Sequence, residues 1–393
     1  MSLEVNRLNE LVERVQADVV NWRRHLHQNP EPSFHEEKTS QFIYDTLESF
    51  GGLELTRPTK TSVVAKLKGS RPGRVLAIRA DMDALPINEE NNFEFVSKNE
   101  GVMHACGHDG HTSILLGTAK VLSDLKDEIP GEIHFIFQHA EELFPGGAEE
   151  MVQAGVMDSV DQVIGLHLWS PLEVGKIEIA AGPMFAAPDE FKVTIYGKGG
   201  HAAQPHLTVD SIAIGAQVVT NLQHIVSRNV DPLDPLVLSV TQFIAGTAHN
   251  VIPGSVYLNG TVRSFKSELR EEVPALMERI IKGVTEAHGA TYEFNYQKGY
   301  RPVINDKEVT AKLREALVEA FGEETIQEGV PTMGAEDFSG FQQKAPGTFF
   351  MVGAGNEEKG IVYPHHHPRF TIDEDSLPMG VKAFVQAVFK IND

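Results

Sequence analysis

About the first 180 residues alternate between short apolar runs and segments with helical periodicity. Runs rich in Ile, Val or Phe are typical of buried strands, whereas apolar residues three and four apart indicate amphipathic helices. The predicted strands are RVLAIRA (74–80), EIHFIFQ (132–138) and DQVIGLHL (161–168). The predicted helices are EEKTSQFIYDTLESFGG, HTSILLGTAKVLSDL and GAEEMVQAG. This alternation predicts an α/β sheet with helices on both faces.

The pattern changes between about residues 184 and 300. The predicted elements there are a strand (190–197), a helix (208–227), two strands (235–246 and 255–265), a helix (267–287) and a strand (291–300). This β-α-β-β-α-β order is the ferredoxin-like arrangement. We therefore predict a discontinuous α/β domain with a mixed sheet, residues 1–183 and 301–393, interrupted by a ferredoxin-like α+β domain at residues 184–300.

Composition and charge narrow the classes of function. A chain of 393 residues is longer than a single hydrophobic core usually organises, which agrees with two domains. The formal net charge of -21 argues against binding to nucleic acid or to an anionic membrane surface. A single cysteine, no signal-peptide pattern in the first 20 residues and no apolar run long enough for a membrane span predict a cytoplasmic protein.

Ionisable residues follow each of the three predicted strands. Asp81 and Asp83 follow the first, Glu141 and Glu142 follow the second, and the third delivers His167. Ligands of open α/β sheets gather outside the carboxyl ends of the strands. We expect these side chains to share one site.

The stretch GVMHACGHDGH (101–111) contains the only cysteine of the chain. Cys106 and His108 are two residues apart, and thiolate and imidazole are preferred ligands of zinc-like metals. A buried thiol beside surface histidines is the alternative. The chain has no HExxH, CxxC or GxSxG motif, which argues against zincins, zinc fingers and serine hydrolases.

Adjacent carboxylates suit a hydrolase with two metals. Glu141 and Glu142 could divide two tasks, one as metal ligand and one as acceptor of a proton from water. A solvated helix cap is the alternative.

Other polar motifs lie later in the chain. Three consecutive histidines, 365–367, are bracketed by two prolines, and they could also be an incidental surface loop. The inserted segment holds His201, Asn250 and Arg263. Arginine is the natural bidentate partner of a carboxylate, and asparagine is a neutral donor.

Taken in order, these motifs resemble a known family. The set comprises NWRRHLHQNPEPSFHE, RADMDALP, MHACGHDGHT, HAEE, GLH, GKGGHAAQPH, NVIPGS, GTVRSF, GAEDFS and HHHPRF. It is similar to the aminoacylase/carboxypeptidase G-type dinuclear metallopeptidases, and most similar to the branch of hippurate hydrolase and N-acyl-amino-acid amidohydrolases. The resemblance covers nearly the whole chain. It implies a dinuclear-metal catalytic domain with an inserted lid and dimerisation domain.

The resemblance also implies the roles of individual residues. The implied metal ligands are Cys106, His108, Glu142, His167 and His366. His108 would bridge two divalent ions, and Glu141 would be the general base. Other branches take one ligand from an HxD motif where this chain has Asp81-Met82-Asp83, and Cys106 would replace it. Asp83 would then orient a ligand.

The substrate-holding residues implied by the resemblance lie in the inserted domain. His201 would reach the site of a partner subunit and stabilise the oxyanion, which implies a homodimer. Asn250 and Arg263 would bind the carboxylate of the amino-acid half. The branch shows a single histidine where this chain has three; the following PRF favours His366, and His365 and His367 stay open.

The predicted activity is hydrolysis of N-acyl amino acids, of the hippurate or N-acetyl type, with two divalent ions of Mn²⁺, Zn²⁺, Co²⁺ or Ni²⁺. The alternatives are a dipeptidase or aminopeptidase of the same superfamily and a non-catalytic metal-binding dimer. The sequence leaves open the acyl group and the metal.

Overall fold

An eight-stranded mixed sheet organises the larger of two units in the computed structural model, which describes residues 3–392. This larger unit comprises the residues up to Met184, Ile304–Val330 and the residues from Asp337 on. The strand order is β1-β2-β4-β3-β5-β16-β6-β15. The strand bounds are β1 (Glu54–Thr56), β2 (Val63–Lys68), β3 (Arg71–Asp81), β4 (Pro130–Gln138), β5 (Gln162–Glu173), β6 (Ile177–Ile179), β15 (Ile326–Glu328) and β16 (Gly347–Gly355).

Four adjacent strands of this sheet run parallel. Strand β3 pairs with β4 on one side and with β5 on the other, and β5 pairs with β16. Their carboxyl ends therefore meet at one edge of the sheet. Asp81 is the last residue of β3, Glu141 and Glu142 follow β4, and His167 lies within β5.

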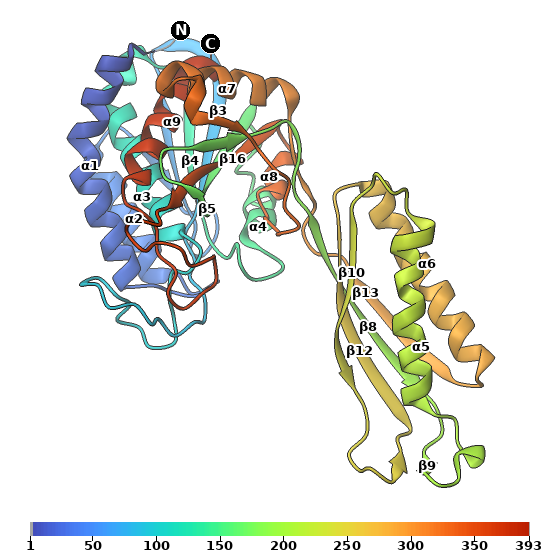
Figure 1. Cartoon of the computed structure of the whole chain (residues 1–393). Helices are drawn as coiled ribbons and strands as arrows, with labels where there is room; N and C mark the ends of the chain where they lie inside the picture. The colour runs from blue at the N-terminus through green and yellow to red at the C-terminus, as the bar shows by residue number, and fades with distance from the viewer. Residues whose placement is uncertain (1–2, 393) are drawn as a thin grey trace. The chain divides into compact units, whose positions relative to one another are not determined.

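Helices cover both faces of the sheet (Figure 1). On one face, Gly110 of α3 lies so close to β5 that a side chain at this position would touch Leu168. On the other face, a side chain at Gly165 of β5 would touch Phe338, which precedes α8. Residues 165 and 168 of β5 point to opposite faces. The helix bounds are α1 (Val5–Gln28), α2 (Glu37–Phe50), α3 (His108–Asp124), α4 (Gly147–Gln153), α7 (Lys307–Phe321), α8 (Ser339–Gln342) and α9 (Ser376–Ile391).

The second unit, here called the inserted unit, comprises Phe185–Val303 and Pro331–Glu336. Its elements are β8 (Ala187–Tyr196), β9 (Gly200–His201), α5 (Ser211–His224), β10 (Leu236–Ile244), β11 (Val251–Ile252), β12 (Ser255–Ser264), α6 (Ser267–Ala287) and β13 (Thr291–Gln297). Its four-stranded sheet has the order β10-β12-β8-β13. That order confirms the ferredoxin-like arrangement, with α5 and α6 on one face (Figure 1).

Short elements complete the chain. Strands β7 (Gly182–Phe185) and β14 (Val303–Asn305) pair with each other, and the short helical turns are η1 (Lys126–Glu128), η2 (Pro205–Leu207), η3 (Ile225–Asn229) and η4 (Glu323–Thr325). Across residues 3–392, no helix has both the length and the apolar character that crossing a bilayer requires.

Some predicted element ends shift in the structure. Helix α5 begins at Ser211 rather than residue 208, because the Asp210 side chain accepts hydrogen bonds from the amides of Ile212 and Ala213 and caps the helix. The last strand, β13, ends at Gln297 rather than residue 300. After it, the Gly299 amide donates to the Asp189 carboxylate at 3.0 Å instead of continuing the ladder.

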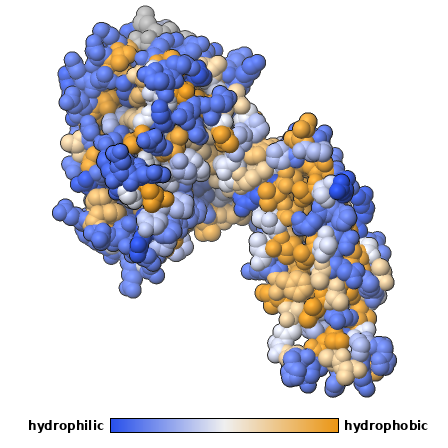
Figure 2. Space-filling model, in the orientation of Figure 1, coloured by the Kyte–Doolittle hydropathy of each residue, from blue (hydrophilic) through white to orange (hydrophobic). Residues whose placement is uncertain are grey.

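The two units have separate cores. The inserted unit buries the apolar sides of its strands against α5 and α6, including Phe191, Val218 and Met277. Its visible surface also carries patches of apolar side chains (Figure 2). Phe243 and Ile244 at the end of edge strand β10 are among the exposed large hydrophobic residues.

Candidate metal centre

The candidate metal ligands converge beyond the carboxyl ends of the parallel strands. The potential ligand atoms of Cys106, His108 and His167 lie within 4.8 Å of one another, and so do those of Cys106, Glu142 and His366. His108, Glu141 and Glu142 form a third such group. All five side chains predicted as metal ligands therefore gather with the predicted base.

Each of these residues is presented by a different local structure. Gly107, in the left-handed conformation with φ of 93°, precedes His108, the first residue of α3. This conformation suits glycine, and it turns the chain between the cysteine and the histidine. His167 lies within β5, and Glu142 follows β4. The larger unit thus supplies ligands from the start of α3, from β5, from the residues after β4 and from one later loop.

The hydrogen bonds of His108 and His167 determine which ring nitrogen of each could bind a metal. His108 Nδ1 lies 3.0 Å from the carbonyl oxygen of Asp83, and His167 Nδ1 lies 2.9 Å from that of Leu168. A carbonyl only accepts hydrogen bonds, so both Nδ1 atoms carry a proton, and Nε2 is the nitrogen of each ring that could bind a metal. His108 Nε2 is buried with no hydrogen-bond partner among the described residues. His167 Nε2 lies 3.6 Å from the sulfur of Cys106.

The electrostatics of the cluster favour a cation. Burial alone lowers the pKa of an imidazole, yet the carboxylates of Asp81 and Asp83 outweigh it and raise the pKa of His108 to about 10. Burial and the nearby Glu142 raise the pKa of the Cys106 thiol well above its usual range. A divalent ion would supply the positive charge that this pocket favours and would stabilise the thiolate. The residues present therefore fit a metal centre.

The hydrogen bonds of His108 argue against the bridging role predicted for it. A neutral imidazole with one nitrogen protonated has one lone pair and binds one ion. The Nδ1–H of His108 is committed to Asp83, so His108 has only Nε2 to offer. Cys106 belongs to two of the ligand groups, and a thiolate sulfur has several lone pairs. The geometry favours Cys106, rather than His108, as the shared ligand.

Asp83 holds two parts of the cluster. Its Oδ1 lies 3.1 Å from Nδ1 of His108, and its Oδ2 accepts the amide of Glu142 at 3.1 Å. The Ser33 hydroxyl donates to the same Oδ2 at 2.7 Å. Asp83 therefore holds the ring of His108 and ties it to the loop of Glu142.

Asp81 and His111 form a support that the sequence did not assign. His111 Nδ1 donates to Asp81 Oδ1 at 2.6 Å, and the Leu168 amide donates to His111 Nε2 at 2.9 Å. Both ring nitrogens of His111 are thereby used within the protein. Arg79 joins Asp81 to Asp337 through hydrogen bonds of 2.8 and 2.9 Å. Burial raises the pKa of Asp337 to about 6.

The three consecutive histidines have different surroundings. The half-buried His365 accepts the Ser170 amide at 3.2 Å and stacks on Trp169. His367 stacks on Tyr363. His366 places Nε2 3.0 Å from Oε1 of Glu142 and has a left-handed backbone, with φ of 66°.

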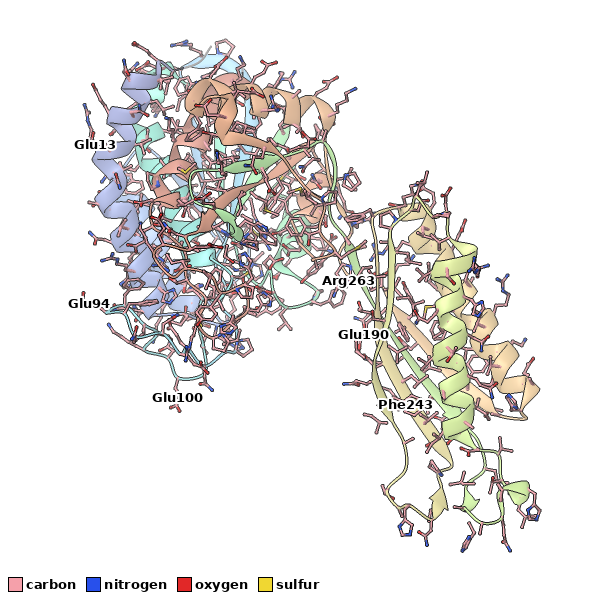
Figure 3. The ribbon with its side chains drawn as sticks, in the orientation of Figure 1. Glu13, Glu94, Glu100, Glu190, Phe243 and Arg263 are labelled. Carbon is pink, nitrogen blue, oxygen red and sulfur yellow. The ribbon has the colours of Figure 1, made fainter. Side chains whose placement is uncertain are left out.

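The predicted substrate residues all lie in the inserted unit. His201 in β9 pairs with Val251 of β11, and the Ala202 amide donates to the carbonyl of Asn250, so His201 and Asn250 are neighbours. Arg263 lies near the far end of β12, where its Nε donates to Thr261 (Figure 3). The chain therefore brings two of the three residues together and leaves the third apart.

Comparisons with known proteins agree with this site. The model of Peptidase family M20/M25/M40 matches residues 77–390. The N-acyl-L-amino acid amidohydrolase of Geobacillus stearothermophilus is 73% identical over 298 residues, covering 76% of this chain and 80% of that protein. The N-acetylcysteine deacetylase of Bacillus subtilis is 41% identical and covers 94% and 95% of the two chains. The crystal structure of YXEP from Bacillus subtilis, a dinuclear metal binding peptidase, superposes with a TM-score of 0.85 at 36% identity and covers 97% and 99%.

Proposed function

The chain belongs to peptidase family M20/M25/M40, and on that premise we propose that it hydrolyses the amide bond of N-acyl amino acids with two divalent metal ions. The products are a carboxylic acid and a free amino acid. The observation that carries this function is the gathering of five ligand side chains around a further carboxylate, Glu141. A protein that only stored metal would have no use for that carboxylate.

The ligands are divided around Cys106. Cys106, His108 and His167 would hold one ion, and Cys106, Glu142 and His366 would hold the other, since these are two groups of potential ligands that share the cysteine. Bound there, divalent ions would polarise the substrate carbonyl and lower the pKa of water. Asp83 keeps the Nδ1 proton of His108 in place, which leaves Nε2 free for the ion.

The protein's own groups move the protons. Glu141 is buried and lies among the ligands, where it takes the proton of the attacking water and later delivers it to the leaving amine. His201 stabilises the negative charge that develops on the carbonyl oxygen. Asn250 and Arg263 bind the substrate carboxylate.

The central test is the Glu141→Ala variant with its metal content measured. We expect two ions per chain and a loss of at least about 100-fold in kcat on hippurate or N-acetyl amino acids, because general acid–base catalysis is removed. Glu149→Ala, which changes an exposed glutamate of α4, is the matched control and should keep wild-type activity. Wild-type turnover by a Glu141→Ala enzyme that holds two metals would refute the mechanism.

The substrate class is tested on the wild-type enzyme. N-acetyl-Leu should be hydrolysed and Leu-Gly should not, since no carboxylate is assigned to a free α-amino group. A preference for Leu-Gly would favour a dipeptidase. Binding of metal without turnover of any N-acyl amino acid would favour a non-catalytic protein. Assays with Mn²⁺, Zn²⁺, Co²⁺ and Ni²⁺ would identify the working metal, since a mixed N, O and S site suits all four.

We further propose that the protein works in the cytoplasm as a homodimer joined through the inserted unit. Its single cysteine suits a reducing compartment. Asn250 lies just before β11, close in the chain to the start of β12 at Ser255, whereas Arg263 lies near the other end of β12. The eight residues of strand from Ser255 to Arg263 span roughly 25 Å. One chain cannot direct both side chains at one carboxylate. Two copies could. The exposed side chains of Phe243, which is labelled in Figure 3, and of Ile244 offer apolar surface for their contact.

A further inference from the structure

Glu36 occupies an unusual position for a buried carboxylate. It is fully buried at the start of α2, where an acidic side chain would ordinarily cap its own helix. It makes no such cap. Its Oε1 instead accepts the amide of Ala140 at 2.8 Å, 104 residues away in the chain. Ala140 directly precedes the Glu141–Glu142 pair.

The same oxygen serves two strained residues. Oε1 also accepts the amide of Phe34 at 3.0 Å. Phe34 and Ala140 have φ of 68° and 49°, and among residues 3–392 only His366 is another non-glycine with positive φ. Side chains with a Cβ rarely adopt this conformation, and it persists only where the surroundings impose it.

The conformation of Ala140 sets the direction of the catalytic carboxylates. The chain leaves β4 at Gln138 and must turn at once so that Glu141 and Glu142 face the metal cluster. The Gly147 amide closes this loop on the carbonyl of Ala140 at 3.0 Å. Glu36 holds the amide side of the same residue, so Ala140 is fixed from both sides.

We propose that Glu36 is a positioning residue, which holds Ala140 in its left-handed conformation and thereby aims the general base Glu141. It acts as a hydrogen-bond acceptor and not through its charge. This inference rests on the proposed function, and it assigns a task to the PSFHE segment (residues 32–36).

The inference predicts different outcomes for two replacements. Glu36→Gln keeps an oxygen that accepts both amides and should retain kcat within about threefold of wild type. Glu36→Ala leaves the Ala140 amide unpaired and should lose on the order of 100-fold in kcat, the scale of a misplacement of about 1 Å, with KM little changed. Two metal ions per chain should remain bound.

Two further variants separate positioning from general stability. Thr61→Val is the matched control, because Thr61 donates only to the other oxygen, Oε2, at 3.0 Å. It should lower the melting temperature and leave kcat within about twofold of wild type. Adding Ala140→Gly to Glu36→Ala should recover part of the lost kcat, because glycine adopts positive φ without strain.

Hydrogen–deuterium exchange supplies a readout that does not depend on turnover. The Ala140 amide should exchange faster in metal-free Glu36→Ala than in metal-free wild type or Thr61→Val. Equal exchange, equal damage by Glu36→Gln and Glu36→Ala, or a kcat loss explained entirely by lost metal or lost folded protein would overturn the inference. An inactive wild type would refute the proposed function instead, while the exchange of Ala140 would still decide the role of Glu36.

Discussion

At the scale of single residues, the tautomers of the histidines explain the composition of the site. His108 and His167, two of the proposed ligands, each have the Nδ1 proton held by a backbone carbonyl, which leaves Nε2 for a metal. His111 is equally buried, yet both of its nitrogens are hydrogen-bonded within the protein. The hydrogen-bond partners of each histidine in the fold, and not its residue type, therefore determine whether it has a nitrogen available for a metal.

Cys106→Ser should lose metal and activity together. A serine hydroxyl ionises far less readily than a thiol, so it is a poor ligand, and Cys106 belongs to two ligand groups. Mutating a residue that hydrogen-bonds a metal ligand typically lowers metal affinity about 10–100-fold. Loss of the shared ligand itself should therefore lower metal affinity by more than about 100-fold. Chelator competition measures this loss. Metal-free wild type and variant should melt within a few degrees of each other, and unchanged affinity would contradict the assignment.

His134 should make stability depend on pH. Burial lowers its pKa in the folded protein, although its contact with Glu132 partly opposes this. The stability contribution of the neutral ring is present above the unfolded pKa of about 6.5 and is lost as pH falls, because the unfolded chain binds the proton first.

The His134→Gln variant tests this dependence. Unfolding by urea, measured on metal-free protein between about pH 7 and 5, should show a shallower loss of stability in the variant than in wild type. Parallel curves would show that His134 does not contribute.

At the scale of elements, a buried ion pair joins α1 to the helix that begins with His108. Arg23 Nε donates to Asp109 Oδ2 at 2.9 Å, and both side chains are 1% exposed. His27 Nδ1 also lies 2.8 Å from this oxygen. The first turn of α3 is thus anchored directly beneath the site.

Asp109→Asn should destabilise the larger unit by up to about 3–5 kcal/mol, because it leaves the buried Arg23 with the partly exposed Glu374 as its remaining carboxylate partner. Arg7→Gln is the matched control, since it removes an exposed ion pair with Glu128 and should cost at most about 1 kcal/mol. Thermal unfolding of both variants measures the difference. Equal shifts would mean that the buried pair carries no special weight.

At the scale of the whole molecule, the metal should stabilise one unit alone. Every assigned ligand lies in the larger unit, whereas the inserted unit has its own core. Calorimetry of the full chain should show two unfolding transitions. After chelation of the metal, the melting temperature of one should fall by on the order of 10 °C, and that of the other should not change. Asp189→Asn should move the second transition, because Asp189 accepts Arg270 and Tyr296 within the inserted unit. Chelation that moves both transitions equally would contradict two independent units.

Subunit mixing should reveal a site shared between two copies. Asn250→Ala and Arg263→Ala should each be inactive alone. When they are mixed under conditions that exchange subunits, half of the dimers are mixed and each regains one intact site, giving about a quarter of wild-type activity. Light scattering gives the oligomeric state. No recovery in confirmed mixed dimers would show that both residues serve the site from one chain.

The sequence by itself determined the two-part organisation, the ferredoxin-like insertion, and the strands β4 and β5 near which Glu142 and His167 lie. These follow from local signals, since apolar periodicity and the order of elements are written in neighbouring residues. Helix α6 covers the predicted residues 267–287. Strands β1 and β15 at the two edges of the sheet and their neighbours β2 and β6 were not predicted, because strands of three to six residues leave too short a pattern.

Only the tertiary structure decided which side chains meet. It distinguished His366 from its two neighbours, whose rings pack against Trp169 and Tyr363. It committed the second nitrogen of His108 to Asp83, and it connected Glu36 to Ala140. These contacts join residues up to hundreds of positions apart, and their hydrogen bonds depend on distances and directions that no local pattern encodes.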